Sequence, residues 1–219
     1  LSLYSNGGNY LRSRTRTSLM EPYNFTKSNR WPYLSPLRYP GGKAILYPLL
    51  KDLAELNLGE SRVYAEPYAG GSGAALELLF NGVVERVLLN DADRHIYAFW
   101  RVVLNDTDWL VERIDRVRVT MTEWRRQRTI YQEHRAHTLK DVAFSTFFLN
   151  RCNRGGILPK AGPIGGFEQK GNFLIDARFH KEHLIERIQA ISKKRDQISF
   201  ENQDAKDFIR ERLGQFRNS

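Results

Sequence analysis

The sequence predicts an α/β protein with a parallel, Rossmann-like sheet and a nucleoside-binding pocket at the carboxyl ends of its strands. The first observation is an apolar strand over 63–66 that leads into a glycine-rich turn over 70–73, with a helix beginning near Ser72. Glycine lets a ligand approach the backbone closely, and a helix start offers unpaired N–H groups beside it. The second observation is another apolar stretch, over 84–89, that ends beside Asp91.

Asp91 supplies the second half of the predicted pocket. It follows Gly71 by 20 residues. At about this distance an acidic residue at a second strand end accepts hydrogen bonds from ribose hydroxyls. A glycine cluster alone is more often an ordinary turn between a strand and a helix. The turn and the acidic residue together therefore predict a nucleoside site.

The composition favours a polyanionic partner. The 219 residues include 34 lysines and arginines against 25 acidic residues, which gives a formal net charge of +9. This balance favours nucleic acid first and a membrane surface second. No apolar run reaches the roughly 18 residues that span a bilayer, so we expect no integral membrane protein. The single cysteine, Cys152, excludes an internal disulfide and favours a reducing compartment such as the cytoplasm.

The chain divides into an arm, a core and an insertion. Residues 1–35 are rich in serine, asparagine and arginine, which predicts a loose basic arm. The α/β core is predicted over 36–104 and 170–219. Between these segments, 105–169 are predicted to form a helical insertion that ends in a basic, glycine-rich loop. Such a loop suits close contact with a DNA backbone.

Periodicity and turn signals define the elements in order. A helix over 72–80 ends at Asn81-Gly82, and 95–104 form a second, apolar helix. Two features of the insertion follow. A set of apolar residues recurs at helical spacing and defines one helical face, namely Leu110, Ile114, Val117, Met121 and Trp124. A further helix begins near Thr138, which forms a capping-box pattern with Asp141.

The last section returns to a core-like pattern. Leu184, Ile188 and Ile191 mark a helix, and 198–202 form a third strand. Asp204 follows this strand as another acidic residue at a strand end. A helix over 205–213 is predicted to end at Gly214.

Several motifs in one order resemble the N6-adenine DNA methyltransferases of the Dam type (D12 class), from about Leu37 to the end of the chain. They are Arg-Tyr-Pro-Gly-Gly-Lys43, Glu-Pro-Tyr-Ala-Gly-Gly71, Asn-Asp91, Phe-Phe-Leu-Asn-Arg151, Gly-Pro-Ile-Gly-Gly166 and Asn-Gln-Asp204. The resemblance implies a Rossmann-like, S-adenosylmethionine-dependent methyltransferase core with an inserted helical target-recognition domain. It also implies methyl transfer to adenine N6 in double-stranded DNA, in a prokaryotic or phage-type restriction–modification setting.

The resemblance carries roles over to two sets of residues. Tyr39 and Lys43 would cover the methionine end of the cofactor, and Asp91 would hold its ribose. Asp204 would accept a hydrogen bond from the adenine amino group. The whole cofactor set is Tyr39, Gly41, Gly42, Lys43, Glu66, Tyr68, Gly70, Asp91 and Asp204. The DNA-binding set is Arg38, Arg151, Asn153 and Arg154. A sulfonium cofactor is cationic, so a pocket that contains the Glu66 carboxylate suits it.

Two departures from the family pattern change the expectation. The catalytic signature Asp-Pro-Pro-Tyr should follow Asp204 by one helix, but no two prolines of this sequence are adjacent. We therefore expect no catalytic residue within the 219 residues and no methyl transfer by them alone. We also expect a C-terminal segment or a partner subunit to cover the exposed edge of the 62–66 strand. In the loop after Asn153, Arg154 and Pro159 stand where GATC-reading members carry an aromatic residue and an arginine, which does not favour GATC as the target.

Rival readings remain at this point. One is a catalytically inactive DNA-binding or interaction protein on a degenerate methyltransferase scaffold. A cytosine-C5 methyltransferase needs a cysteine nucleophile, usually after proline, whereas Cys152 follows Arg151 and is predicted to be a packing residue. One cysteine and five scattered histidines do not favour a zinc site, so we expect no metal. A dehydrogenase would need the full G-x-G-x-x-G turn, which the sequence lacks.

Overall fold

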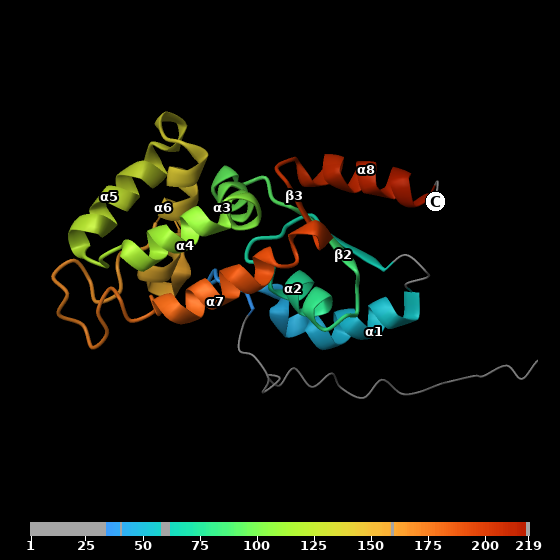
Figure 1. Cartoon of the computed structure of the whole chain (residues 1–219), viewed down its shortest axis with the longest axis horizontal. Coiled ribbons are helices and arrows are strands. Elements are labelled where there is room, and N and C mark those ends of the chain that lie inside the picture. The colour runs from blue at the N-terminus through green and yellow to red at the C-terminus, as the bar shows by residue number, and fades with distance from the viewer. Residues whose placement is uncertain (1–33, 40, 58–61, 159, 218–219) are drawn as a thin grey trace, which may run out of the picture.

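A computed structural model describes residues 34–39, 41–57, 62–158 and 160–217 of the chain (Figure 1). The basic arm predicted over 1–35 lies outside the described residues except for its last two positions. The helices are α1 (Tyr47–Asn57), α2 (Gly73–Phe80), α3 (Arg94–Asn105), α4 (Thr107–Arg116), α5 (Met121–Gln132), α6 (Leu139–Cys152), α7 (Lys181–Ser192) and α8 (Ala205–Arg217). The short 3-10 helices are η1 (Lys43–Leu46), η2 (His134–Ala136), η3 (Arg154–Gly156) and η4 (Arg195–Gln197).

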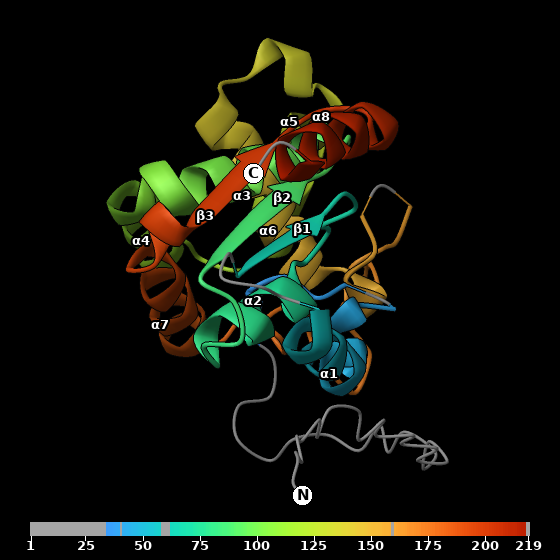
Figure 2. The ribbon, with the colours of Figure 1, turned by 90° about the vertical axis from the view of Figure 1, so that its right-hand side faces the viewer.

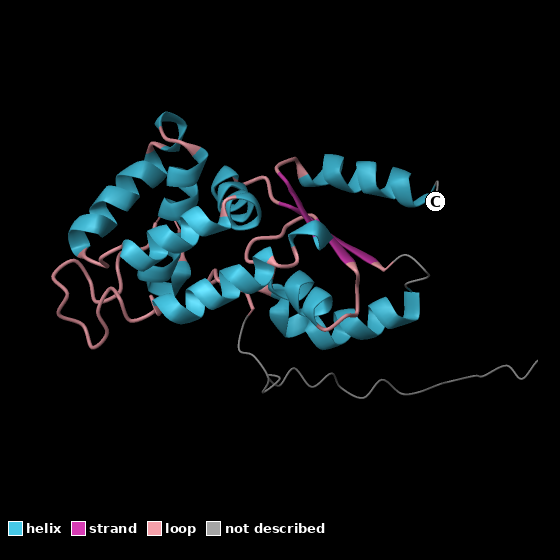
Figure 3. Cartoon of the chain, viewed as in Figure 1, coloured by secondary structure: helices cyan, strands magenta, loops and turns pink. Residues whose placement is uncertain are grey.

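A parallel sheet of three strands lies between the helices (Figure 3). The strands are β1 (Val63–Glu66), β2 (Arg86–Asn90) and β3 (Ile198–Glu201), and their order is β1-β2-β3. Register pairs Glu66 with Leu89 and Asn90 with Glu201, so the three carboxyl ends meet at one edge of the sheet. The predicted α/β class and the three predicted strands are therefore confirmed, although β2 begins two residues later than expected.

Helices cover both faces of the sheet (Figures 1 and 2). The helices α1 and α2 lie on one side, and α8 lies on the other. On α2, five residues of the run Gly-Ala-Ala-Leu-Glu-Leu-Leu-Phe are buried, because this helix connects β1 to β2 beneath the sheet. None of the helices in the described ranges is long and apolar enough to cross a bilayer.

The helices of the predicted insertion pack directly onto the predicted core. The Phe99 ring on α3 stacks on Phe147 of α6 with centroids 5.9 Å apart, and Trp100 stacks on Phe200 of β3 at 6.0 Å. One cluster of buried hydrophobic residues includes all four rings. The boundary drawn at 105–169 stays a prediction, and the two parts share one hydrophobic core in the described chain.

Two sequence predictions of helix limits were wrong. The apolar face from Leu110 to Trp124 belongs to two helices. The helix α4 ends at Val117, where the backbone becomes extended (ψ 136°). A second helix, α5, begins after Thr120, whose side chain accepts from the Glu123 N–H. The helix expected to end at Gly214 continues to Arg217. Glycine within a helix costs only about 1 kcal/mol relative to alanine, which the surrounding helix-forming residues can offset. The N-cap at Thr138 is confirmed, because its hydroxyl oxygen accepts from the Asp141 N–H at 3.2 Å, while the Asp141 carboxylate accepts from the Thr138 hydroxyl at 2.6 Å.

Candidate functional site

Asn90, the last residue of β2, ties together the loops that follow all three strands. Its side chain is fully buried, and its amide donates to the Pro67 and Gln203 carbonyls, both at 3.1 Å. Its side-chain oxygen accepts from the Gln203 N–H at 2.9 Å. An amide can donate and accept at once, so one buried residue fixes two loops against the end of the central strand. Asn90 was not among the predicted site residues, and its position at the strand end is its only local signal.

Asp91 lies directly beyond Asn90 and touches the glycine turn. Its Oδ2 accepts from the Gly70 N–H at 2.8 Å, and its Oδ1 accepts from the Asp93 N–H at 3.0 Å. Each carboxylate oxygen has two lone pairs, so both oxygens keep acceptor capacity for a ligand. The structure thus brings together the turn and the acidic residue that the sequence paired.

The glycine turn needs residues without side chains because Tyr39 lies against it. Gly70 has φ +49°, and a Cβ built there would stand 2.9 Å from Cζ of the Tyr39 ring. Any larger residue would displace the ring. The turn is anchored from behind, since the Trp100 indole N–H on α3 donates to the Gly70 carbonyl at 2.9 Å. Trp100 is a second residue of the site that the sequence analysis did not single out.

Tyr39 is half exposed over this turn, and it faces acidic groups. Burial raises the pKa of the Tyr39 phenol above its ordinary value, and the negative charges of Asp91 and Asp93 raise it further. The ring therefore carries an un-ionised hydroxyl at neutral pH. The neighbouring Gly42 closes the turn before Lys43, with its N–H 3.0 Å from the Tyr39 carbonyl, and Gly41 has φ +71°.

Lys43 and Glu66 form an ion pair at the floor of the site. The Lys43 Nζ lies 2.9 Å from Glu66 Oε1 and donates to the Tyr68 carbonyl at 2.5 Å. The Glu66 side chain is 3% exposed, whereas that of Lys43 is 38% exposed. Burial raises the pKa of the Glu66 carboxyl, and the Lys43 ammonium acts in the opposite direction. The lysine predicted to meet a ligand thus contacts an internal carboxylate while one side of it faces solvent.

Tyr68 and Asp204 complete the predicted cofactor set from two different loops. The Tyr68 side chain is exposed, with 65% of its surface accessible. Asp204 is exposed and caps α8, where its Oδ1 accepts from the Lys206 N–H at 2.8 Å. Asp204 follows Gln203, which Asn90 holds, so it stands at the same edge of the sheet as Asp91. The predicted cofactor residues therefore come from the loops after all three strands and from the segment 39–43.

The predicted DNA-binding residues lie around a second buried amide, that of Asn150. Asn150 accepts from the Arg38 N–H at 2.7 Å and donates to the carbonyls of Arg38 (2.8 Å) and Gly156 (2.9 Å). Gly156 has φ +72°, and a Cβ there would come within 2.6 Å of the Arg38 carbonyl oxygen. These contacts place the segment before Tyr39 directly against the loop that follows α6.

The four DNA-binding predictions fall into two environments. Arg151 and Asn153 are buried, and Asn153 accepts from the Trp124 indole N–H at 2.8 Å and donates to the Ile157 carbonyl at 2.9 Å. Arg38 is half-buried and Arg154 is exposed. Direct contact with DNA therefore stays a prediction. Of the four residues, Arg38 and Arg154 are the most accessible to DNA. Cys152 is fully buried, as expected of a packing residue, and burial raises the pKa of its thiol.

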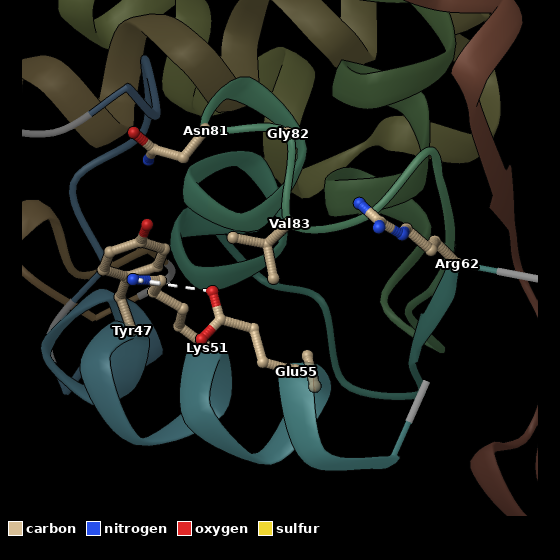
Figure 4. A pocket seen from close by; sticks show the side chains of 8 residues that line it. Tyr47, Lys51, Glu55, Arg62, Asn81, Gly82 and Val83 are labelled. Atoms are coloured by element: carbon tan, nitrogen blue, oxygen red, sulfur yellow. Dashed lines mark ion pairs between the residues drawn. The ribbon is translucent and has the colours of Figure 1, made fainter. Parts of the chain in front are cut away.

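A cavity of about 510 Å³ lies elsewhere, between α1 and the turn after α2 (Figure 4). It is lined by residues that include Tyr47, Lys51, Glu55, Arg62 and Asn81. Lys51 and Glu55 lie one turn apart on α1 and form an ion pair at 3.5 Å on its wall. Arg62 precedes β1, so this cavity is near the amino end of that strand. Ligands of open parallel sheets bind at the carboxyl ends, so we place the candidate site where Asn90 contacts the loops after β1 and β3, here called the Asn90 junction, rather than in this cavity.

A known protein family matches most of the chain. The family model described as D12 class N6 adenine-specific DNA methyltransferase matches residues 39–216. No curated protein matches the chain at a significant level. The matched range contains every predicted cofactor residue and all the predicted DNA-binding residues except Arg38.

Proposed function

Because the chain belongs to the D12 class N6 adenine-specific DNA methyltransferases, we propose that it binds S-adenosylmethionine at the Asn90 junction and serves methyl transfer to adenine N6 in double-stranded DNA. The observation that carries this proposal is the convergence of three strand-end loops on one buried asparagine. The convergence places a glycine turn, Asp91 and Asp204 at one edge of the sheet.

The residues present suit the proposed cofactor. The turn at Gly70 lies close beneath Tyr39, which leaves backbone and an aromatic ring where a flat adenosyl group would bind. Asp91 offers carboxylate oxygens for ribose hydroxyls, and the solvent-facing side of Lys43 suits a ligand carboxylate. When bound, the cofactor supplies an electrophilic methyl group on a cationic sulfur. Glu66 is buried and paired with Lys43, so in this proposal Asp91 and Asp204 are the carboxylates that would favour a cationic ligand.

DNA would contact the basic side of the molecule around the loop after α6. Arg38 and Arg154 are the accessible arginines there, and Asn150 holds the two segments that carry them. In this proposal Arg151 and Asn153 stabilise the loop and do not touch DNA. The Arg151 side chain donates to a main-chain carbonyl, and Asn153 accepts from Trp124. The net charge of +9 also favours association with a polyanion such as DNA.

The edge of β1 that does not pair with β2 offers a place for a further strand. Among the described residues β1 pairs only with β2, and Figure 2 looks onto its other edge between α1 and α8. Both helices carry exposed apolar residues, such as Leu56 at 81% and Leu213 at 54%. An unpaired apolar edge favours pairing with another strand. We infer that such a strand, from another segment of the same protein or from a partner subunit, pairs with β1 and supplies the groups that hold the target amine.

Two readouts test this proposal on the 219 residues. The chain should bind duplex DNA and, in a separate titration, S-adenosylhomocysteine. With tritiated S-adenosylmethionine, the chain alone should transfer no methyl group to DNA, because no Asp-Pro-Pro-Tyr sequence is present. Failure to bind either ligand would contradict the proposed function. Labelled DNA would show that the catalytic groups lie within these residues.

A further inference from the structure

The ring of His95, in the first turn of α3, lies between two oxygen atoms. Its Nδ1 is 2.9 Å from Oδ1 of Asp93, and its Nε2 is 3.0 Å from the main-chain carbonyl oxygen of Tyr131. The His95 side chain is 13% exposed, so these two contacts are largely shielded from water. The predicted site residues do not include His95, and the family match assigns it no role.

Both contacts require a doubly protonated ring. A carboxylate and a main-chain carbonyl accept hydrogen bonds and cannot donate them. A neutral imidazole carries a single N–H, so one of its nitrogens would turn a lone pair toward an oxygen. The imidazolium form donates from both nitrogens and satisfies both oxygens. The geometry therefore favours His95 with two ring protons and a positive charge.

The nearest groups favour this positive charge. Burial acts to raise the pKa of the Asp93 carboxyl, but the hydrogen bonds from His95 bring it below its ordinary value, so Asp93 is ionised at neutral pH. The Tyr131 carbonyl belongs to the last turn of α5, where the helix dipole is negative. The Tyr131 ring also stacks on the imidazole with centroids 3.8 Å apart, and the face of a phenol ring attracts a cation.

The other titratable groups around the ring are neutral. His134 of η2 lies edge-to-face with His95, with centroids 4.6 Å apart. Burial and then the charges of His95 and Arg94 lower the pKa of His134, while the Tyr131 carbonyl acts in the opposite direction. Burial raises the pKa of the Tyr131 phenol, and Asp93 and Tyr39 raise it further. Of the two neighbouring histidines, His95 is therefore the one that carries the charge.

His95 reaches the proposed cofactor site through Asp93. The Asp93 N–H donates to Oδ1 of Asp91 at 3.0 Å, and Oδ2 of Asp91 accepts from the Gly70 N–H at 2.8 Å. On its other side the ring bonds to α5 through the Tyr131 carbonyl. One charged ring thus joins the 91–93 loop to a helix of the predicted insertion.

We propose that doubly protonated His95 is a positioning residue that holds the 91–93 loop in the shape that binds the ribose of the adenosyl cofactor. The inference rests on the proposed cofactor function and adds a dependence on pH to it. The second hydrogen bond of the ring is present while His95 carries two protons and is lost as the pH rises. Cofactor affinity should therefore fall with rising pH across the range in which histidine changes charge, about pH 5 to 8.

Calorimetric titration with S-adenosylhomocysteine at several pH values in this range tests the role. The affinity of the unaltered chain should fall by roughly threefold to tenfold, the equivalent of one hydrogen bond. His95→Gln should lose this dependence, because an amide keeps a donor and an acceptor that do not titrate. The matched control is His183→Gln on α7, whose exposed ring pairs with Glu186 at 3.5 Å. This control and His134→Gln should both keep the dependence.

Nitrogen NMR of the His95 ring gives a second readout, which needs no variant. Both ring nitrogens should carry protons where the cofactor binds tightly, and the loss of one proton should follow the same pH course as the loss of affinity. If His95→Gln fails to keep the fold by circular dichroism, this comparison decides. Coincident courses would support the role, and a proton lost without a change in affinity would refute it.

The outcomes separate the inference from the function on which it rests. If the unaltered chain binds S-adenosylhomocysteine equally at every pH, or if His95→Gln keeps the dependence, the positioning role is refuted and the cofactor function stands. If the unaltered chain binds no S-adenosylhomocysteine, the proposed function and this role both fail.

Discussion

Replacing Asn90 with alanine tests whether the three strand-end loops depend on one buried side chain. The change removes two donated hydrogen bonds at 3.1 Å and one accepted bond at 2.9 Å. Each hydrogen bond contributes about 0.5–1.5 kcal/mol, and a buried partner left unsatisfied costs about 1–3 kcal/mol. Because Asn90 is fully buried, we expect the free energy of unfolding to fall by roughly 3–4 kcal/mol.

Urea unfolding monitored by circular dichroism measures this loss. The matched control is Asn105→Ala, because Asn105 is exposed on α3 and makes a single bond to the Arg101 carbonyl at 2.8 Å. The control should change the free energy of unfolding by less than about 0.5 kcal/mol. A loss for Asn90→Ala as small as that of the control would refute the idea that Asn90 joins the loops.

Three further predictions concern the surroundings of the glycine turn. Trp100→Phe replaces the fully buried indole with a smaller ring and removes the donor to the Gly70 carbonyl, so unfolding measurements should show a loss of roughly 2–4 kcal/mol, and no loss would place the turn's anchor elsewhere. Burial acts to raise the pKa of Asp93, but bonds from the His95 ring and main chain bring it below 3.8. The stability from ionised Asp93 is therefore present above about pH 4 and lost as the pH falls through the lowered value. Asp93→Asn should flatten the acid limb of a plot of unfolding midpoint against pH, and an unchanged limb would contradict this. Gly70→Ala should displace Tyr39 and weaken binding of S-adenosylhomocysteine in calorimetry, since the added Cβ would lie 2.9 Å from the ring; unchanged binding would mean that the turn is not part of the pocket.

The strands and the glycine turn could be predicted because their signals are local. Each strand is a short apolar run bounded by turn residues, and the limits predicted for β1 agree with the structure. The break between α4 and α5 could not be predicted from apolar spacing, because Leu110 and Trp124 keep helical spacing across it. Only the extended conformation at Val117 and the cap at Thr120 separate the two helices.

The parts of the site that sequence patterns did not reveal depend on tertiary contacts. Its place at a strand end is the only local feature that distinguishes Asn90 from a surface asparagine, and its role follows from loops that are far apart in the sequence. Arginine usually lies at the surface, yet Arg151 is buried and donates to the carbonyls of Arg178 and Pro36. The approach of Tyr39 to Gly70 likewise joins two segments that lie 31 residues apart and that no periodicity connects.

Calorimetric titration with S-adenosylhomocysteine tests the central claim most directly, because it asks whether the Asn90 junction holds the adenosyl cofactor. Asp91→Ala should weaken binding by about 1–3 kcal/mol, since it leaves ligand hydroxyls without an acceptor. Lys51→Ala, in the cavity near the amino end of β1, is the control and should bind as the unaltered chain does. Equal affinity of the Asp91 variant and the unaltered chain, or a loss confined to the Lys51 variant, would contradict the assignment of the site.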